Sequence, residues 1–171
     1  MISSSSATKL TAPINSAGDL VRSVAEETAE LEALLALLRE EQQALQERDV
    51  ERVFSFAVAK SERLARLRAF DSARGGFLRA NGLSQDHSGM QRYIERTSGL
   101  PAAVSESWRR LLANAAEARQ INAVNGSLIV AQLRFVDGAL AALQQTALHL
   151  VCYGADGQSR SAPASRSLAS A

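Results

Sequence analysis

The sequence predicts an all-α protein, an elongated antiparallel bundle of three long helices and one short helix with coiled-coil-like packing. Its 171 residues are enough for one domain with a hydrophobic core. Only 5% of the residues are aromatic and three are proline, whereas the strong helix formers Ala, Leu, Glu, Gln and Arg dominate the middle of the chain. Strictly alternating apolar and polar runs are absent, so no strand is predicted.

Charge and composition exclude several classes of function. The 19 basic and 18 acidic residues give no general attraction to nucleic acid or anionic lipid. The single cysteine, Cys152, requires no oxidising compartment. The Ser-rich start, Met1 to Thr11, lacks the apolar core of a secretory signal. The most apolar stretch, Leu31 to Leu38, is too short to span a bilayer, so we expect a cytoplasmic protein with no stable membrane insertion.

The first helix is predicted to begin at Ser16, because Ser followed three residues later by Asp19 is a helix start signal. The apolar residues that follow recur in steps of mostly three, four or seven, which is the heptad pattern of helices packed side by side. They are Leu20, Val24, Leu31, Leu35, Leu38 and Leu45.

Asp49 is predicted to cap a second helix, which carries Lys60 among its inward positions. That helix either ends at Gly75-Gly76 or continues to Ala80 and stops at Asn81-Gly82, and both endings stay open. A short helix with Met90, Tyr93 and Ile94 on one side then ends at Ser98-Gly99.

The last helix is predicted to be the longest, from about Pro101 to Cys152. Its heptad pattern places Asn122 and Asn125 on the buried seam, although the sequence does not say whether the helix bends at Gly126 or Gly138. Residues 1–15 are predicted to be flexible, residues 16–153 to form the helical domain, and residues 154–171 to form a disordered tail.

The sequence predicts no catalytic residue, metal site or cofactor. His87 is expected in a polar loop beside Asp86, with no convergent partners for acid–base or metal chemistry. His149 on the last helix would suit a phosphotransfer domain, but the apolar residues after it argue against that role. Cys152 is interpreted as a half-buried structural thiol.

Two segments stand out from this background. A glycine inside a helix and asparagines on a seam both lower stability, so the segment Asn122-Ala-Val-Asn125-Gly126 indicates either partner specificity or a local amide network. At the end of the helix, Tyr153-Gly-Ala-Asp-Gly-Gln158 is either a docking anchor or a simple helix cap.

With Trp108 early in the long helix, these two segments resemble the FlgN family of flagellar export chaperones over about Val104 to Gln158. The resemblance implies a cytoplasmic chaperone that binds the C-terminal segments of the hook–filament junction proteins FlgK and FlgL. Such a chaperone prevents premature assembly and delivers its client to the flagellar export gate. The partner-binding residues that we assign on this basis are Asn122, Asn125, Gly126, Ile129, Tyr153, Gly154, Asp156 and Gly157.

Two alternatives stay open at this point. The chain could be a self-associating structural coiled-coil bundle with no client, and a client-binding form could itself be a monomer or a homodimer. The sequence also does not identify which helix faces form the client groove, or whether one or both junction proteins are clients.

Overall fold

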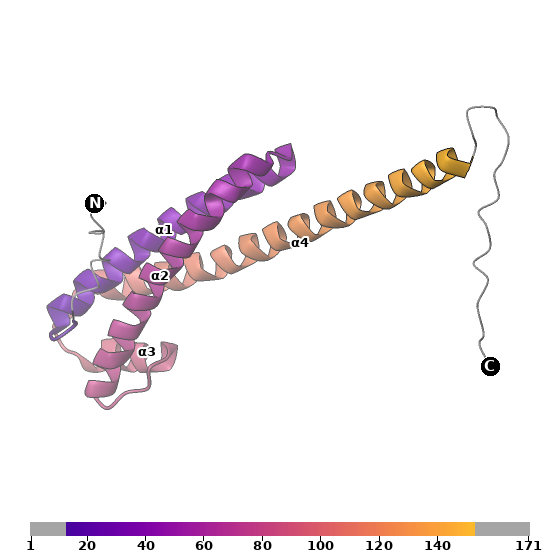
Figure 1. The fold of residues 1–171 in the computed structure, drawn as a ribbon. Coiled ribbons are helices and arrows are strands. Elements are labelled where there is room, and N and C mark those ends of the chain that lie inside the picture. The colour runs from indigo at the N-terminus through magenta and orange to yellow at the C-terminus, as the bar shows by residue number, and fades with distance from the viewer. Residues whose placement is uncertain (1–12, 153–171) are drawn as a thin grey trace, which may run out of the picture. The chain divides into compact units, whose positions relative to one another are not determined.

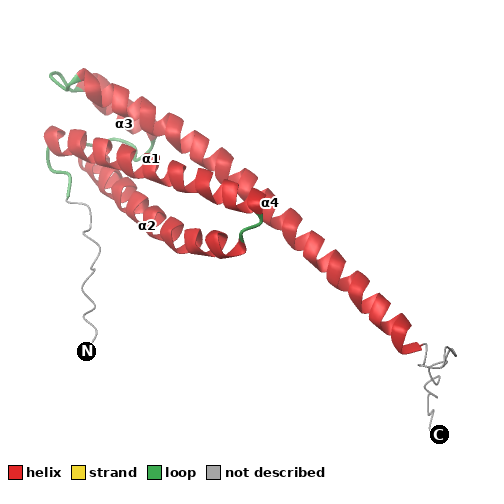
Figure 2. Ribbon diagram, turned by 90° about the horizontal axis from the view of Figure 1, so that it is seen from above, coloured by secondary structure: helices red, strands yellow, loops and turns green. Residues whose placement is uncertain are grey.

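A computed structural model describes residues 13–152 of the protein, with side chains for residues 13–145. All regular structure in this part of the chain is α-helical, as predicted. The helices are α1 (Ala17–Glu47), α2 (Val50–Ala80), α3 (His87–Arg96) and α4 (Ala102–Cys152), shown in Figures 1 and 2. The three long helices and one short helix of the predicted bundle are therefore confirmed.

Side-chain caps define where the first two helices begin. Ser16 Oγ accepts a hydrogen bond from Asp19 N at 3.1 Å, and Asp49 Oδ1 accepts one from Arg52 N at 3.1 Å. Each cap satisfies a backbone N–H group that the helix itself leaves unpaired. Between α1 and α2, the chain reverses through Arg48, a left-handed residue with φ of 58°. Both predicted helix starts are confirmed.

The connections around α3 depart from the prediction at both ends of that helix, which ends at Arg96, before the expected Ser98-Gly99. Helix α2 runs through Gly75-Gly76 and ends at the Asn81-Gly82 pair, where Asn81 Nδ2 donates to Phe77 O at 2.9 Å. The expected loop position of His87 was wrong, because His87 is the first residue of α3. Asp86 caps that helix by accepting from Gly89 N at 3.0 Å, which is why the helix starts one residue after it.

The chain divides into two compact units at residue 127, of which the structure describes residues 13–127 and residues 128–152. In the first unit α2 runs antiparallel to α1, since Lys60 contacts Glu41 whereas Arg74 contacts Glu27. Helix α4 runs parallel to α1, since Arg110 contacts Glu32 and Asn125 contacts Leu38. This is the up-down-up arrangement of an antiparallel three-helix bundle.

The core of the first unit lies between α1, α2 and α4, with α3 adding Met90. All six apolar positions predicted on α1 are buried, as expected for a seam that faces two other helices. The buried apolar residues of α2 and α4 that complete this core are Phe77, Leu78, Val104, Trp108, Leu111 and Ala118.

The second unit, within the described residues, consists of the rest of α4. The helix is continuous from Ala102 to Cys152, so neither Gly126 nor Gly138 interrupts it. Among residues 128–145, whose side chains are described, none is buried. The predicted tail, residues 154–171, lies outside the described residues.

Candidate partner-binding site

Asn125 lies in the interior of the first unit, where 1% of its surface is exposed. Its Nδ2 donates one hydrogen bond to the backbone oxygen of Leu38 and one to Glu41 Oε2, both at 2.9 Å. The prediction that Asn125 faces the buried seam is therefore correct. These bonds connect α4 to α1 two residues before the first unit ends.

The carboxylate of Glu41 also connects α2 to this polar layer. Lys60 Nζ on α2 donates to Glu41 Oε1 at 2.5 Å, and Glu41 is 2% exposed. A buried charge is tolerated only when it is paired and hydrogen-bonded, and Glu41 has both kinds of partner. The layer Lys60–Glu41–Asn125 specifies one register of the three helices, because sliding any helix by a turn would leave the carboxylate unpaired.

The other asparagine of the motif was placed wrongly by the sequence pattern. Asn122 is exposed, although its side chain borders a groove between the three helices. Gly126 is also exposed, and a Cβ atom built on it would meet no atom within 4 Å. Around residues 122–126 the other helices cover only part of the seam of α4. Asn125 is therefore buried, whereas Asn122 is exposed.

The remaining assigned residues belong to the other part of the chain. Ile129 is half-buried and lies just after the boundary between the two units. Tyr153, Gly154, Asp156 and Gly157 lie outside the described residues, so the structure brings none of them to Asn125.

A second buried polar cluster lies toward the other end of the first unit. Arg74 pairs with Glu27, and its guanidinium lies 5.1 Å from the ring centre of Trp108. The ring of His87 stacks on Trp108 with 6.0 Å between centres. Burial raises the pKa of the Glu27 carboxyl, and the charge of Arg74 offsets part of that effect. The cluster fixes the helices to one another and presents no open ligand position.

Sequence reasoning missed the acidic members of both clusters. These residues are Glu27 and Glu41, and both are buried. The available signal was their spacing, since Glu27, Leu34 and Glu41 are seven residues apart and so share one side of α1. No group of three or more His, Cys, Asp or Glu residues that could hold a metal ion occurs in the described part of the chain.

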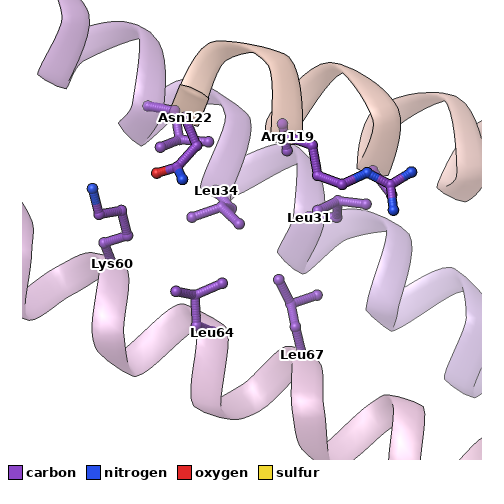
Figure 3. Close-up of a pocket in the computed structure, with 10 residues that line it drawn as sticks. Leu31, Leu34, Lys60, Leu64, Leu67, Arg119 and Asn122 are labelled. Atoms are coloured by element: carbon purple, nitrogen blue, oxygen red, sulfur yellow. The ribbon is translucent and has the colours of Figure 1, made fainter. Parts of the chain in front are cut away.

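An apolar groove opens on the first unit beside the polar layer, with a volume of about 240 Å³ (Figure 3). Leucine side chains from α1 and α2 point toward one another across it, and two alanines of α4 also line it. Its lining residues are Leu31, Leu34, Leu38, Lys60, Leu64, Leu67, Ala115, Ala118, Arg119 and Asn122.

The second unit presents a continuous apolar face. Its positions follow one another at intervals of four and three, so they lie on one side of the helix. They are Ile129, Leu133, Val136, Leu140 and Leu143, of which the last four are between 51% and 67% exposed. By length and composition only, α4 between Ala102 and Gln145 is also apolar enough to cross a membrane. A helix that binds a protein partner can pass the same test.

Comparison with known protein families identifies this architecture. A family model described as "FlgN protein" matches residues 16–161, which is most of the chain. The chain belongs to the FlgN family. Neither a search of curated proteins nor a search of solved structures found a match.

The FlgN family is a family of flagellar export chaperones and not of enzymes. The match begins at Ser16, the cap of α1, and extends past α4 to include the segment from Tyr153 to Gln158. The resemblance on the asparagine segment and on the tyrosine segment therefore falls inside one continuous match.

Proposed function

We propose that this FlgN protein acts in the cytoplasm, where it binds the C-terminal segments of the hook–filament junction proteins FlgK and FlgL. It keeps these segments from assembling prematurely and delivers them to the flagellar export gate. The observation that carries the proposal is the apolar face of α4 after residue 128. A contiguous apolar surface that is exposed to solvent is typical of a site that binds a partner.

The face continues the seam that packs the bundle. In the first unit, α4 contributes Val104, Trp108, Leu111 and Ala118 to the core, at intervals of three, four or seven. The same intervals continue through Ile129 to Leu143, where no described side chain is buried. An amphipathic client segment can lay its own apolar face along this stripe, as α1 does in the first unit.

The expected energetics suit a chaperone that must release its client. Burial of one large apolar side chain contributes about 1.5–3 kcal/mol, and at least four such side chains are exposed on this face. Ordering a disordered client offsets about 2–5 kcal/mol of that gain. The difference, about 1–10 kcal/mol before the entropy cost of association, favours a reversible complex over an irreversible one.

Charges placed on this face test the proposal. The double variant Val136→Asp/Leu140→Asp should weaken binding of a fluorescent peptide from the FlgK or FlgL C-terminus at least tenfold, which corresponds to about 1.4 kcal/mol. The matched control Ala141→Asp/Gln145→Asp adds the same charge on the opposite side of the helix and should bind normally. Equal loss in both variants, with unchanged helix content, would contradict the assignment of the face.

The rival function is a self-associating bundle without a client, in which the same face of a second copy would cover the stripe. Sedimentation at several concentrations, with and without the junction-protein peptide, separates the two. A client-binding chaperone gives a defined complex with peptide, whereas the rival gives a stable oligomer that the peptide does not change.

A flotation experiment with lipid vesicles distinguishes client binding by α4 from membrane binding. We expect the protein to remain unbound in flotation with vesicles of neutral and anionic lipid, because the chain has no excess of basic residues to strengthen insertion. Flotation with the vesicles would instead assign the apolar face to a lipid surface.

A further inference from the structure

The groove of the first unit is a second apolar surface, separate from the face of α4 after residue 128. Leucines of α1 and α2 line it together with Ala115 and Ala118 of α4. Leu64 is 39% exposed at its edge, so the groove opens to solvent rather than being closed inside the core. Figure 3 shows Leu34, Leu64 and Leu67 converging on the empty space.

The size of the groove restricts what it can accept. Its volume of about 240 Å³ is below the ~300–1,000 Å³ typical of sites for drug-sized ligands and cofactors. It exceeds the ~150 Å³ cavity that accommodates benzene in an engineered protein core. The space therefore suits one or two large apolar side chains, which is how a protein segment anchors in a pocket.

The rim of the groove selects the charge of its occupant. The polar residues that line it are Lys60, Arg119 and Asn122, and no carboxylate is among the lining residues. Lys60 already pairs with Glu41, which cancels one of the two positive charges. Arg119 is exposed and forms no ion pair among the described residues. In the same part of the chain, the side chain of Asn122 forms no hydrogen bond. The guanidinium and the amide can therefore donate hydrogen bonds to a partner.

We propose that this groove binds an acidic, apolar protein segment, with a Leu or Phe side chain inserted between α1, α2 and α4. Asp or Glu side chains flanking that anchor then accept hydrogen bonds from Arg119 on one side of it and from Asn122 on the other. The site goes beyond the proposed function and does not rest on it, since it uses none of the face from Ile129 to Leu143.

Two synthetic helical peptides test the charge preference. Both carry the same stripe of Leu and Phe, and one is flanked by Glu whereas the other is flanked by Lys. The Glu peptide should bind the full-length protein at least tenfold more tightly at low salt, and added salt should reduce the difference. Equal affinity of the two peptides would overturn the proposal.

Substitutions locate the peptide. Arg119→Glu should weaken the Glu peptide at least tenfold, whereas the control Arg68→Glu, on an exposed residue that does not line the groove, should change it less than twofold. Ala115→Leu adds three carbon atoms inside the groove and should weaken both peptides. Circular dichroism and urea unfolding show that each variant is folded, and Arg119→Glu keeps the test valid if Ala115→Leu does not fold.

Three results would contradict binding of the Glu peptide in the groove. Equal weakening by Arg119→Glu and Arg68→Glu would show a nonspecific charge effect. Loss of the Glu peptide in Val136→Asp/Leu140→Asp would place that peptide on the other face. Self-association abolished by Ala115→Leu would make a second copy the occupant. Each of these overturns the proposal, and none of them bears on binding of a junction-protein peptide to the α4 face.

Discussion

Asn122 and Asn125 lie one helical turn apart on α4 but differ in burial. The side chain of Asn125 is buried, and its Nδ2 makes two hydrogen bonds to α1. The side chain of Asn122 lies at the exposed rim of the groove. We interpret Asn125 as a residue that positions the helices and Asn122 as one that can touch a partner directly.

This difference predicts opposite behaviour of the two alanine variants. Asn125→Ala removes the donor that satisfies Glu41 and Leu38 O, and should lower the free energy of unfolding by about 1–3 kcal/mol. Asn122→Ala, at an exposed position, should change it by less than about 0.5 kcal/mol. Urea unfolding followed by circular dichroism at 222 nm measures both values.

Asn125→Asp supplies the control, because it keeps the shape of the side chain and places a second carboxylate beside Glu41. It should destabilise the protein at least as much as Asn125→Ala at neutral pH. Similar stability of Asn125→Ala and Asn122→Ala would mean that the Lys60–Glu41 pair is satisfied without the amide.

At the scale of the helices, local sequence signals predicted most boundaries correctly. The caps at Ser16 and Asp49 depend on neighbouring residues only, so they are visible in the sequence, whereas Asn81-Gly82 was one of two endings left open for the second helix. His87 was misplaced because Asp86, an equally local signal, was not interpreted as a cap.

The partners of the buried carboxylates could not be predicted in the same way. The partner of Glu27 is Arg74, 47 residues later, and that of Glu41 is Lys60, 19 residues later. The sequence gives no distance between such pairs until the helices are aligned. For the same reason it predicted a seam through Asn122 but not that the seam would be open there, nor the groove that two alanines of α4 line.

Helix α4 should be unevenly protected against amide hydrogen exchange. Its first half packs on α1 and α2, whereas residues 128–152 belong to a unit with no buried side chain among those described. An isolated helix is only marginally stable in water without tertiary packing. We therefore expect protection factors after residue 128 to be at least tenfold lower than those between residues 104 and 125.

Addition of the junction-protein peptide should raise protection in residues 128–145 while leaving α1 and α2 nearly unchanged. Exchange measured by mass spectrometry with and without peptide checks both statements. Protection that rises only in the first unit would instead locate the client on the groove or on α2.

At the scale of the whole molecule, the proposed function has two tasks, to hold a client and to deliver it. The apolar face of α4 and the groove are formed by residues up to Leu143, whereas the segment from Tyr153 to Gln158 follows the end of the helix. We propose that this later segment, through Tyr153, docks on the export gate. Delivery is then separable from client binding by mutation.

Tyr153→Ala should leave the unfolding free energy and the affinity for the client peptide within twofold of the original protein but reduce export of FlgK and FlgL at least tenfold. The ring supplies a large contact area at low entropy cost, so Tyr153→Phe should retain most export if the ring is the anchor. Secretion of the junction proteins into culture medium, compared with their cytoplasmic level, measures the effect. If Tyr153→Ala instead loses the client peptide, the tyrosine belongs to the client surface, because a gate-docking residue has no contact with the client before delivery.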